Sequence, residues 1–246
     1  YSKDQTFSEL YNFVLFSNVT SSRIKEFLNI FDVDNITQDM WRSLSFRIEQ
    51  NISKTEESIY YKKRYYKKVM CNYTENKVFN GIINFLKTHS KSGLSNQIQI
   101  TSSSVWNEDD NESYCLQDVI NYDNDATEFC SNDDINPWIC FDFKKNIVVP
   151  FNYTIRSIDG SENDHYPKSW VIEGSLDNKE WQVIDEQNDC SFLRGSSFVH
   201  TFSIQNSASQ EFRFLRMRIT GPDWCNCVHL NINCIEFYGE LITYVT

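Results

Sequence analysis

The chain has 246 residues, of which 40% are hydrophobic and 15% aromatic, so it can fold as one large or two modest domains, and wholesale disorder is excluded. Its net charge is −11, and residues 95–246 hold 24 Asp and Glu against 9 Lys and Arg, which argues against binding to nucleic acid. No run approaches the roughly 20 apolar residues that cross a bilayer, so we expect no membrane insertion.

The first 70 residues contain neither glycine nor proline, and their apolar residues recur at helical spacing. Ile24, Phe27, Leu28 and Phe31 form one such stripe, and a further helix is expected to begin at Thr37. Residues 55–70 fit a fourth helix, whose basic cluster at 62–68 is either a solvated face or a contact for RNA, lipid or an acidic partner; we favour the solvated face. This pattern predicts a small helical bundle.

From Gln97 onward the apolar period changes to two, which indicates strands. In the run 139–143, for example, Ile139, Phe141 and Phe143 share one face, and in the run 214–219 Leu215 and Met217 do. Similar alternation occurs in residues 97–101, 198–204 and 231–237. Seven or eight such strands, separated by turn signals, predict an antiparallel sandwich or jelly roll.

Two tryptophans mark a hairpin in this second part. We expect strands at residues 169–175 and 180–185, joined by a turn over 176–179, because Asp177 and Asn178 tolerate left-handed backbone angles. Trp170 and Trp181 are each large enough to bury about 200 Å². One or both should therefore anchor the core between two sheets.

Four ordered motifs in this second part resemble the discoidin-like, or coagulation factor 5/8 type C, family. The motifs are PKSWVIEGSLDNKEW (167–181), NPWICFDF (136–143), FRFLRMRITG (212–221) and NCIEFYG (233–239), within a resemblance that covers residues 79–242. It implies a non-catalytic, eight-stranded jelly roll of the galactose-binding-like fold.

The front part is similar to the helical BACK segment that follows BTB domains. The similarity rests on LYNFVLFSNVTSSRIKEFLNIFD (10–32) and MWRSL (40–44). It implies an intracellular adaptor with BTB, BACK and discoidin-like domains in that order, although these 246 residues hold no BTB domain. The expected fold class is therefore α+β multidomain: a BACK-like helical bundle over residues 1–74, then an all-β eight-stranded jelly-roll sandwich over 75–246.

The eight cysteines leave several interpretations open. An even count would suit disulfides in a secreted protein, but Cys140 and Cys234 fall inside strand-like runs, as structural thiols do. The run Cys225-Asn226-Cys227-Val228-His229, with Cys234 beyond, could hold zinc, form a disulfide or keep free thiols, and we favour free thiols. We thus predict no metal, no cofactor and an intracellular location, in the cytoplasm or at the cytoskeleton, with an extracellular location as the alternative.

The family resemblance implies that ligands bind loops at one end of the barrel, here the residues after Ser104 and the loops 160–166 and 221–229. The candidate ligand-binding residues are Trp106, Asp109, Asp110, His165, Tyr166, Asp223 and Trp224. These side chains either bind a ligand or pack the loops onto the barrel, and we favour packing for the aromatic ones. None of the four histidines lies in a hydrolase or phosphate-loop motif, so no catalytic residue is expected.

The predicted function is a non-enzymatic scaffold or adaptor that binds protein partners, within a cytoskeletal assembly. The alternative is a glycan-binding, lectin-like module in which Trp224 is the aromatic platform and neighbouring acids supply carboxylate hydrogen bonds.

Overall fold

The computed structural model describes residues 66–90, 93–108, 112–113, 115–161, 164–205 and 210–244. The helical bundle predicted for residues 1–74 therefore lies, up to residue 65, outside the described residues. The described residues from Lys67 onward belong to one compact unit. Among the described residues, no helix has the length and apolar character needed to cross a bilayer.

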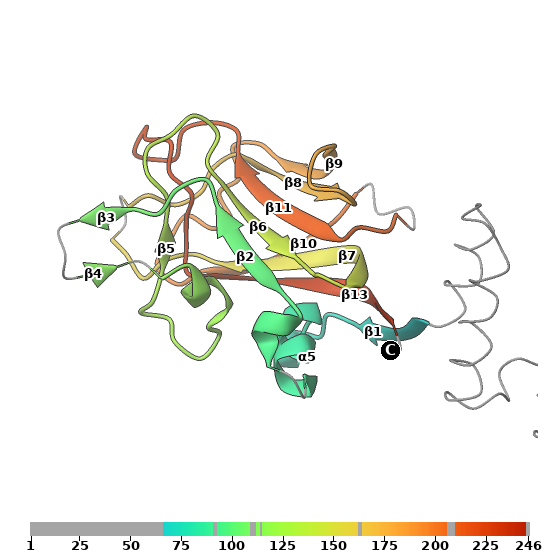
Figure 1. Cartoon of the computed structure of the whole chain (residues 1–246). Coiled ribbons are helices and arrows are strands. Elements are labelled where there is room, and N and C mark those ends of the chain that lie inside the picture. Colours follow the sequence, from blue (N-terminus) through green and yellow to red (C-terminus); the bar gives the residue numbers. More distant parts are fainter. Residues whose placement is uncertain are drawn as a thin grey trace, which may run out of the picture. The chain divides into compact units, whose positions relative to one another are not determined.

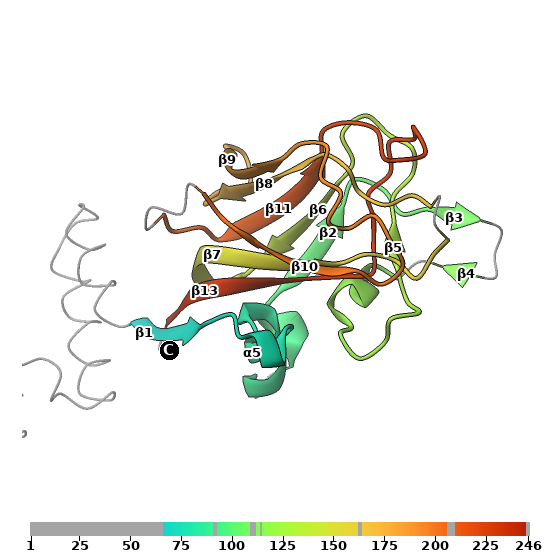
Figure 2. The ribbon, with the colours of Figure 1, turned by 180° about the vertical axis from the view of Figure 1, so that it is seen from behind.

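Two facing antiparallel sheets build this unit, as Figure 1 and, from behind, Figure 2 show. The first sheet has five strands in the order β2 (Gln99–Ser102), β6 (Trp138–Asp142), β11 (Phe214–Ile219), β8 (Trp170–Ser175) and β9 (Gln182–Gln187). The second has four in the order β1 (Tyr66–Cys71), β13 (Cys234–Tyr244), β7 (Asn146–Arg156) and β10 (Val199–Ser203). Strands distant in the sequence alternate in both sheets, as in a jelly roll.

Shorter elements lie around the sandwich. They are the strand pairs β3 (Asn107–Glu108) with β4 (Glu112–Ser113) and β5 (Phe129–Cys130) with β12 (Asn231–Ile232), the helix α5 (Ile82–His89), and the 3-10 turns η2 (Glu75–Lys77), η3 (Leu94–Asn96) and η4 (Leu116–Ile120). Both views place β3, β4, β5 and the loop after β11 at the same end of the sandwich.

Strand β1 corrects two expectations. Residues 66–70 were expected to end a fourth helix, but they form an edge strand beside β13. Cys71 is buried and Val69 half-buried, whereas Lys68 and Met70 are exposed, so this stretch follows a period of two and docks one face on the sheet. Lys68 Nζ pairs with Glu240 Oε2 at 2.9 Å. With β1, the two sheets have nine described strands rather than the eight predicted.

The core lies between the sheets and matches the alternation read from the sequence. Ile139, Phe141 and Phe143 are fully buried, as are Leu215 and Met217 of the neighbouring strand. The run 198–204 follows its prediction only in part, because Phe202 and Ile204 are buried whereas Phe198 is 51% exposed.

The hairpin forms as predicted, but its two tryptophans have different roles. Trp170 is fully buried, and its Nε1 donates to the hydroxyl of Tyr153, which in turn donates to Asp185 Oδ2. Asn178, in the turn, has a φ of 62°. Trp181 lies on the outer face of the five-stranded sheet, where the Arg216 guanidinium stacks 3.9 Å from its ring centre. Trp170 therefore anchors the core, and Trp181 does not.

Helix α5 is tied to the four-stranded sheet by a buried carboxylate. Glu236 of β13 is fully buried, and its Oε1 accepts hydrogen bonds from the backbone N–H groups of Ile83 and Phe237, its Oε2 from that of Asn84. Two of these donors, the N–H groups of Ile83 and Asn84, belong to the first turn of α5, where N–H groups have no acceptor within the helix. Burial nevertheless raises the pKa of Glu236 to about 7.

Candidate functional site

The loop end of the sandwich brings together residues that lie far apart in the sequence. Trp106, which follows β2, packs edge-on against His229, with ring centres 5.6 Å apart. His229 in turn packs edge-on against His165, at 5.0 Å. His165 Nδ1 lies 2.7 Å from Asp223 Oδ2. Three of the predicted candidates, Trp106, His165 and Asp223, thus form one connected cluster through His229.

Asp223 organises the loop 221–229 from within. Its side chain is only 1% exposed, and its Oδ1 accepts the backbone N–H groups of Cys225 at 2.8 Å and Cys227 at 2.9 Å. Its own N–H donates to the carbonyl of Cys227 at 2.8 Å. A short Asp side chain that accepts from the backbone two and four residues ahead closes a tight turn. Asp223 therefore holds the loop and the His165 ring together.

The other predicted aromatic residues serve mainly as packing groups. Tyr166 is fully buried, and its hydroxyl donates to the carbonyl of Ser161 at 2.7 Å. Trp224 is half-buried beneath two cations: its ring centre lies 4.3 Å from Arg194 Cζ and 4.9 Å from Lys168 Nζ. Its Nε1 is buried and has no hydrogen-bond partner among the described residues. Trp224 is therefore covered rather than presented as a flat platform.

Asp109 and Asp110, the remaining two candidates, lie outside the described residues.

A groove that the candidate residues do not include opens beside this cluster. It has a volume of about 310 Å³ and is lined by Asp133, Asp134, Ile135, Asn136, Thr220, Gly221 and Val228. Ile135 is 92% exposed, whereas large apolar side chains are usually covered. Asp133 Oδ1 accepts the N–H of Val228 and so joins the two sides of the groove. The run Asp133-Asp134-Ile135-Asn136 before β6 is the signal from which this groove could have been expected.

The thiols of the loop 221–229 are not activated as nucleophiles. Partial burial and the carboxylate of Asp223 raise the pKa of Cys225 and of Cys227, and Asp133 adds to the effect on Cys227. His165 and Asp223 lie beside Cys227, and a histidine paired with a carboxylate is the kind of base that activates cysteine in thiol enzymes. A nucleophilic cysteine, however, needs a lowered pKa. These surroundings therefore disfavour the thiolate form of both side chains.

Cys234 does not join Cys225, Cys227 and His229 in the grouping considered from the sequence alone. Cys234 is fully buried at the start of β13, and burial raises its pKa to about 12. Instead, His165, Cys227 and His229 each bring one potential ligand atom to within 4.8 Å of the others. All eight cysteines lie in described residues, and none forms a disulfide.

Known proteins are similar to slightly more than half of the chain. A stretch of 131 residues, 53% of this chain, is 25% identical to the E3 ubiquitin-protein ligase hecd-1 of Caenorhabditis elegans, and the chain spans only 5% of the length of that relative. Among solved structures, the Clostridium perfringens module CpGH89CBM32-5 in complex with GalNAc-β-1,3-galactose is 11% identical, with 58% of this chain and 96% of that one covered and a TM-score of 0.45. A Streptococcus pneumoniae fucose binding module is 15% identical, with 57% and 90% covered and a TM-score of 0.43.

The family model of the F5/8 type C domain matches residues 99–230, more than half of the chain. This span runs from β2 to the end of the loop 221–229 and so includes the five-stranded sheet and the loop cluster. Domains of this type are non-catalytic binding modules. The chain therefore belongs to the F5/8 type C domain family.

Proposed function

We propose that this chain is a non-enzymatic adaptor that binds a protein partner at the loop end of its β-sandwich. The observation that carries the proposal is the groove beside the loop cluster. Its volume of about 310 Å³ falls at the lower end of the range of ligand pockets. It combines the carboxylates of Asp133 and Asp134 with a branched apolar side chain, that of Ile135, which is almost fully exposed.

The chemistry of this lining defines the partner. An exposed carboxylate such as that of Asp134 favours a Lys or Arg side chain, and Ile135 and Val228 favour an apolar one beside it. The net charge of −11 would also speed the approach of a basic partner. A peptide segment with a basic residue next to an apolar residue is therefore the best complement.

The sugar-binding alternative is supported by fewer groups. Tyr166 is buried and Trp224 is covered by Arg194 and Lys168, so neither offers an open ring face for stacking. Trp106 remains partly exposed, and the groove offers carboxylate, amide and hydroxyl groups. These groups make a glycan the second candidate ligand.

A peptide-library selection against the full chain tests the proposal. We expect the selected peptides to share a basic residue next to an apolar one. Binding should fall at least about tenfold in Ile135→Ser and in Asp134→Asn, because each removes one side of the complementary surface. Leu176→Ser is the matched control, since Leu176 is also exposed (60%) but lies in the hairpin turn at the other end of β8. Equal losses in Ile135→Ser and Leu176→Ser would contradict the proposal.

A glycan array separates the two candidates. Binding of wild type to a defined sugar, with loss in Trp106→Ala, would replace the protein-binding proposal by the glycan-binding one. Trp224→Ala serves as the second variant, because Trp224 was also a predicted platform.

The wider architecture is part of the same proposal. We propose that the residues before Tyr66, whose apolar side chains follow helical spacing, form a BACK-like helical segment. We also propose that the chain belongs to a BTB–BACK–discoidin adaptor of the cytoskeleton. The eight thiols, most of them buried, fit an intracellular location. Thiol titration of the unfolded protein from its native source tests that location. Eight free thiols per chain would support it, and a lower number would contradict it.

A further inference from the structure

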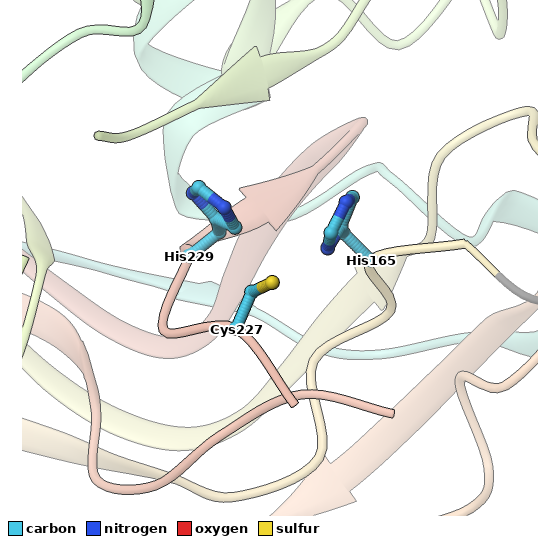
Figure 3. A group of neighbouring side chains, drawn as sticks. All are labelled: His165, Cys227 and His229. Atoms are coloured by element: carbon cyan, nitrogen blue, oxygen red, sulfur yellow. The ribbon is translucent and has the colours of Figure 1, made fainter. Parts of the chain in front are cut away.

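Two histidines and a cysteine converge in the loop cluster. Figure 3 shows His165, Cys227 and His229, from the loops 160–166 and 221–229, gathered around a common space. One nitrogen of each ring and the Cys227 sulfur all lie within 4.8 Å of one another. Imidazole nitrogen and thiolate sulfur are the ligands that Zn²⁺ prefers in proteins.

Hydrogen bonds fix the orientation of both imidazole rings. His165 Nδ1 lies 2.7 Å from the Asp223 carboxylate, and His229 Nδ1 lies 3.1 Å from the Ser131 carbonyl. Both oxygens are acceptors, so each Nδ1 carries the proton and the lone pair is left on Nε2. Histidines that bind metals have this arrangement almost always, with the second nitrogen donating to a carboxylate or a carbonyl.

The loop that carries Cys227 is held rigidly by the same carboxylate. Asp223 Oδ1 accepts the N–H of Cys227 at 2.9 Å, while its Oδ2 orients His165. His229 is 8% exposed and is packed between Trp106 and His165. The three side chains therefore have supported positions rather than free loop conformations.

The spacing suits a tetrahedral ion after a small adjustment. Zn–N distances of about 2.1 Å and Zn–S distances of about 2.3 Å place tetrahedral ligand atoms roughly 3.4–3.6 Å apart. The present separations are at most 4.8 Å, so they need to close by at most about 1.4 Å. The His165 side chain is 36% exposed, so an ion can enter, and three protein ligands leave a fourth position for water or a partner group.

A second grouping, His165 with Asp223 and Cys225, fits less well. Both oxygens of Asp223 already accept hydrogen bonds, and Oδ2 faces the protonated Nδ1 of His165. Asp223 is thus better suited to orient a ligand than to act as one. From this geometry we infer that His165, Cys227 and His229 form a binding site for Zn²⁺, with Asp223 and Ser131 as positioning groups.

Titration of the metal-stripped full chain with Co²⁺ and Zn²⁺ tests this inference. We expect one ion per chain, a thiolate-to-cobalt charge-transfer absorption with tetrahedral d–d bands, and displacement of Co²⁺ by Zn²⁺. Cys227→Ser should abolish the charge-transfer absorption and weaken Zn²⁺ at least about tenfold, whereas the matched control Cys225→Ser should keep both. Asp223→Asn should weaken Zn²⁺ about 10- to 100-fold, as the loss of an orienting partner does.

Several outcomes would overturn the site. One is that wild type binds no stoichiometric Zn²⁺. Another is that Cys225→Ser and Cys227→Ser lose affinity for Zn²⁺ equally, and a third is that the charge-transfer absorption persists in Cys227→Ser. If Cys227→Ser fails to fold, as judged by its thermal unfolding, the half-exposed His165→Ala replaces it and should lose the tetrahedral cobalt spectrum. These measurements involve no peptide, so their outcome is independent of whether the proposed partner binds.

Discussion

Replacing Glu236 with Gln removes a carboxylate that sits wholly inside the protein, at the start of helix α5. The wild-type carboxylate accepts three backbone N–H groups, yet burial raises its pKa from 4.5 to about 7. The thiols of Cys71 and Cys234, which interact with Glu236, do not titrate in this interval, because burial raises the pKa of Cys71 to about 11 and that of Cys234 to about 12. The amide of the Glu236→Gln variant would keep nearly the same shape without the titration.

The size and direction of the effect follow from the two pKa values. Between pH 4.5 and about 7 the folded protein holds a proton on Glu236 that the unfolded chain has released, so the free energy of unfolding falls as the pH rises. A shift of this size corresponds to about 3 kcal/mol, at about 1.4 kcal/mol for each pH unit. The contribution is fully present below pH 4.5 and lost above about 7.

The measurement is a difference between two proteins at two pH values. Urea unfolding of wild type and Glu236→Gln, followed by tryptophan fluorescence at about pH 5 and about pH 8, gives four free energies of unfolding. From about pH 5 to about pH 8 the free energy of unfolding of wild type, minus that of the variant, should fall by up to about 3 kcal/mol. The other titrating groups are the same in both proteins, so their contributions cancel. The same difference at both pH values, or one that grows in favour of wild type as the pH rises, would contradict a raised pKa of Glu236 in the folded protein.

Three further predictions concern the sandwich and use the same unfolding assay. Trp170→Ala should lower the free energy of unfolding by about 3–5 kcal/mol, and Trp181→Ala by clearly less, since only Trp170 lies in the core; equal losses would contradict this. Gly239→Ala should destabilise the protein far more than Gly93→Ala, because a Cβ at Gly239 would collide with the Val149 carbonyl oxygen, whereas one at Gly93 meets nothing within 4 Å. Similar effects of the two substitutions would show that the sheet can shift at Gly239. Burial alone would raise the pKa of Glu173, but hydrogen bonds and charges from Arg216 and Arg218 lower it. The stability that Glu173 contributes is therefore present above the unfolded pKa of 4.5 and is lost as the pH falls. Glu173→Gln should reduce this acid sensitivity, and an unchanged pH profile would argue against the ion pairs of Glu173 with the two arginines.

Much of the sandwich could be predicted from sequence because its strands bury one face each. The alternation in residues 139–143 and in 214–219 identifies which side chains point inward, and the turn residues Asp177 and Asn178 locate the hairpin. Local pattern could not show that Trp181 faces outward, because both hairpin tryptophans are large and apolar. Trp181 stacks there with Arg216, which lies 35 residues later on β11, beyond β8 in the sheet.

The same limit applies to the site. The predicted loops do meet at one end, and Trp106, His165 and Asp223 become neighbours there. The convergence of His165 with Cys227 and His229 could not be read from spacing, since about 60 residues and several strands separate the two loops. Cys234, which spacing placed with Cys227, begins a buried strand instead. Edge strand β1 was missed because Lys67, Lys68 and Met70 also suit a helix.

Mapping of backbone amide shifts would locate the surface of this protein that binds a partner. The full chain, labelled with ¹⁵N, would be titrated with a selected peptide that carries a basic residue next to an apolar one. We expect shift changes concentrated at residues 133–136, 220–221 and 228, which line the groove. Changes concentrated elsewhere, for example at the hairpin turn 176–181, or no changes at saturating peptide, would contradict partner binding at the groove.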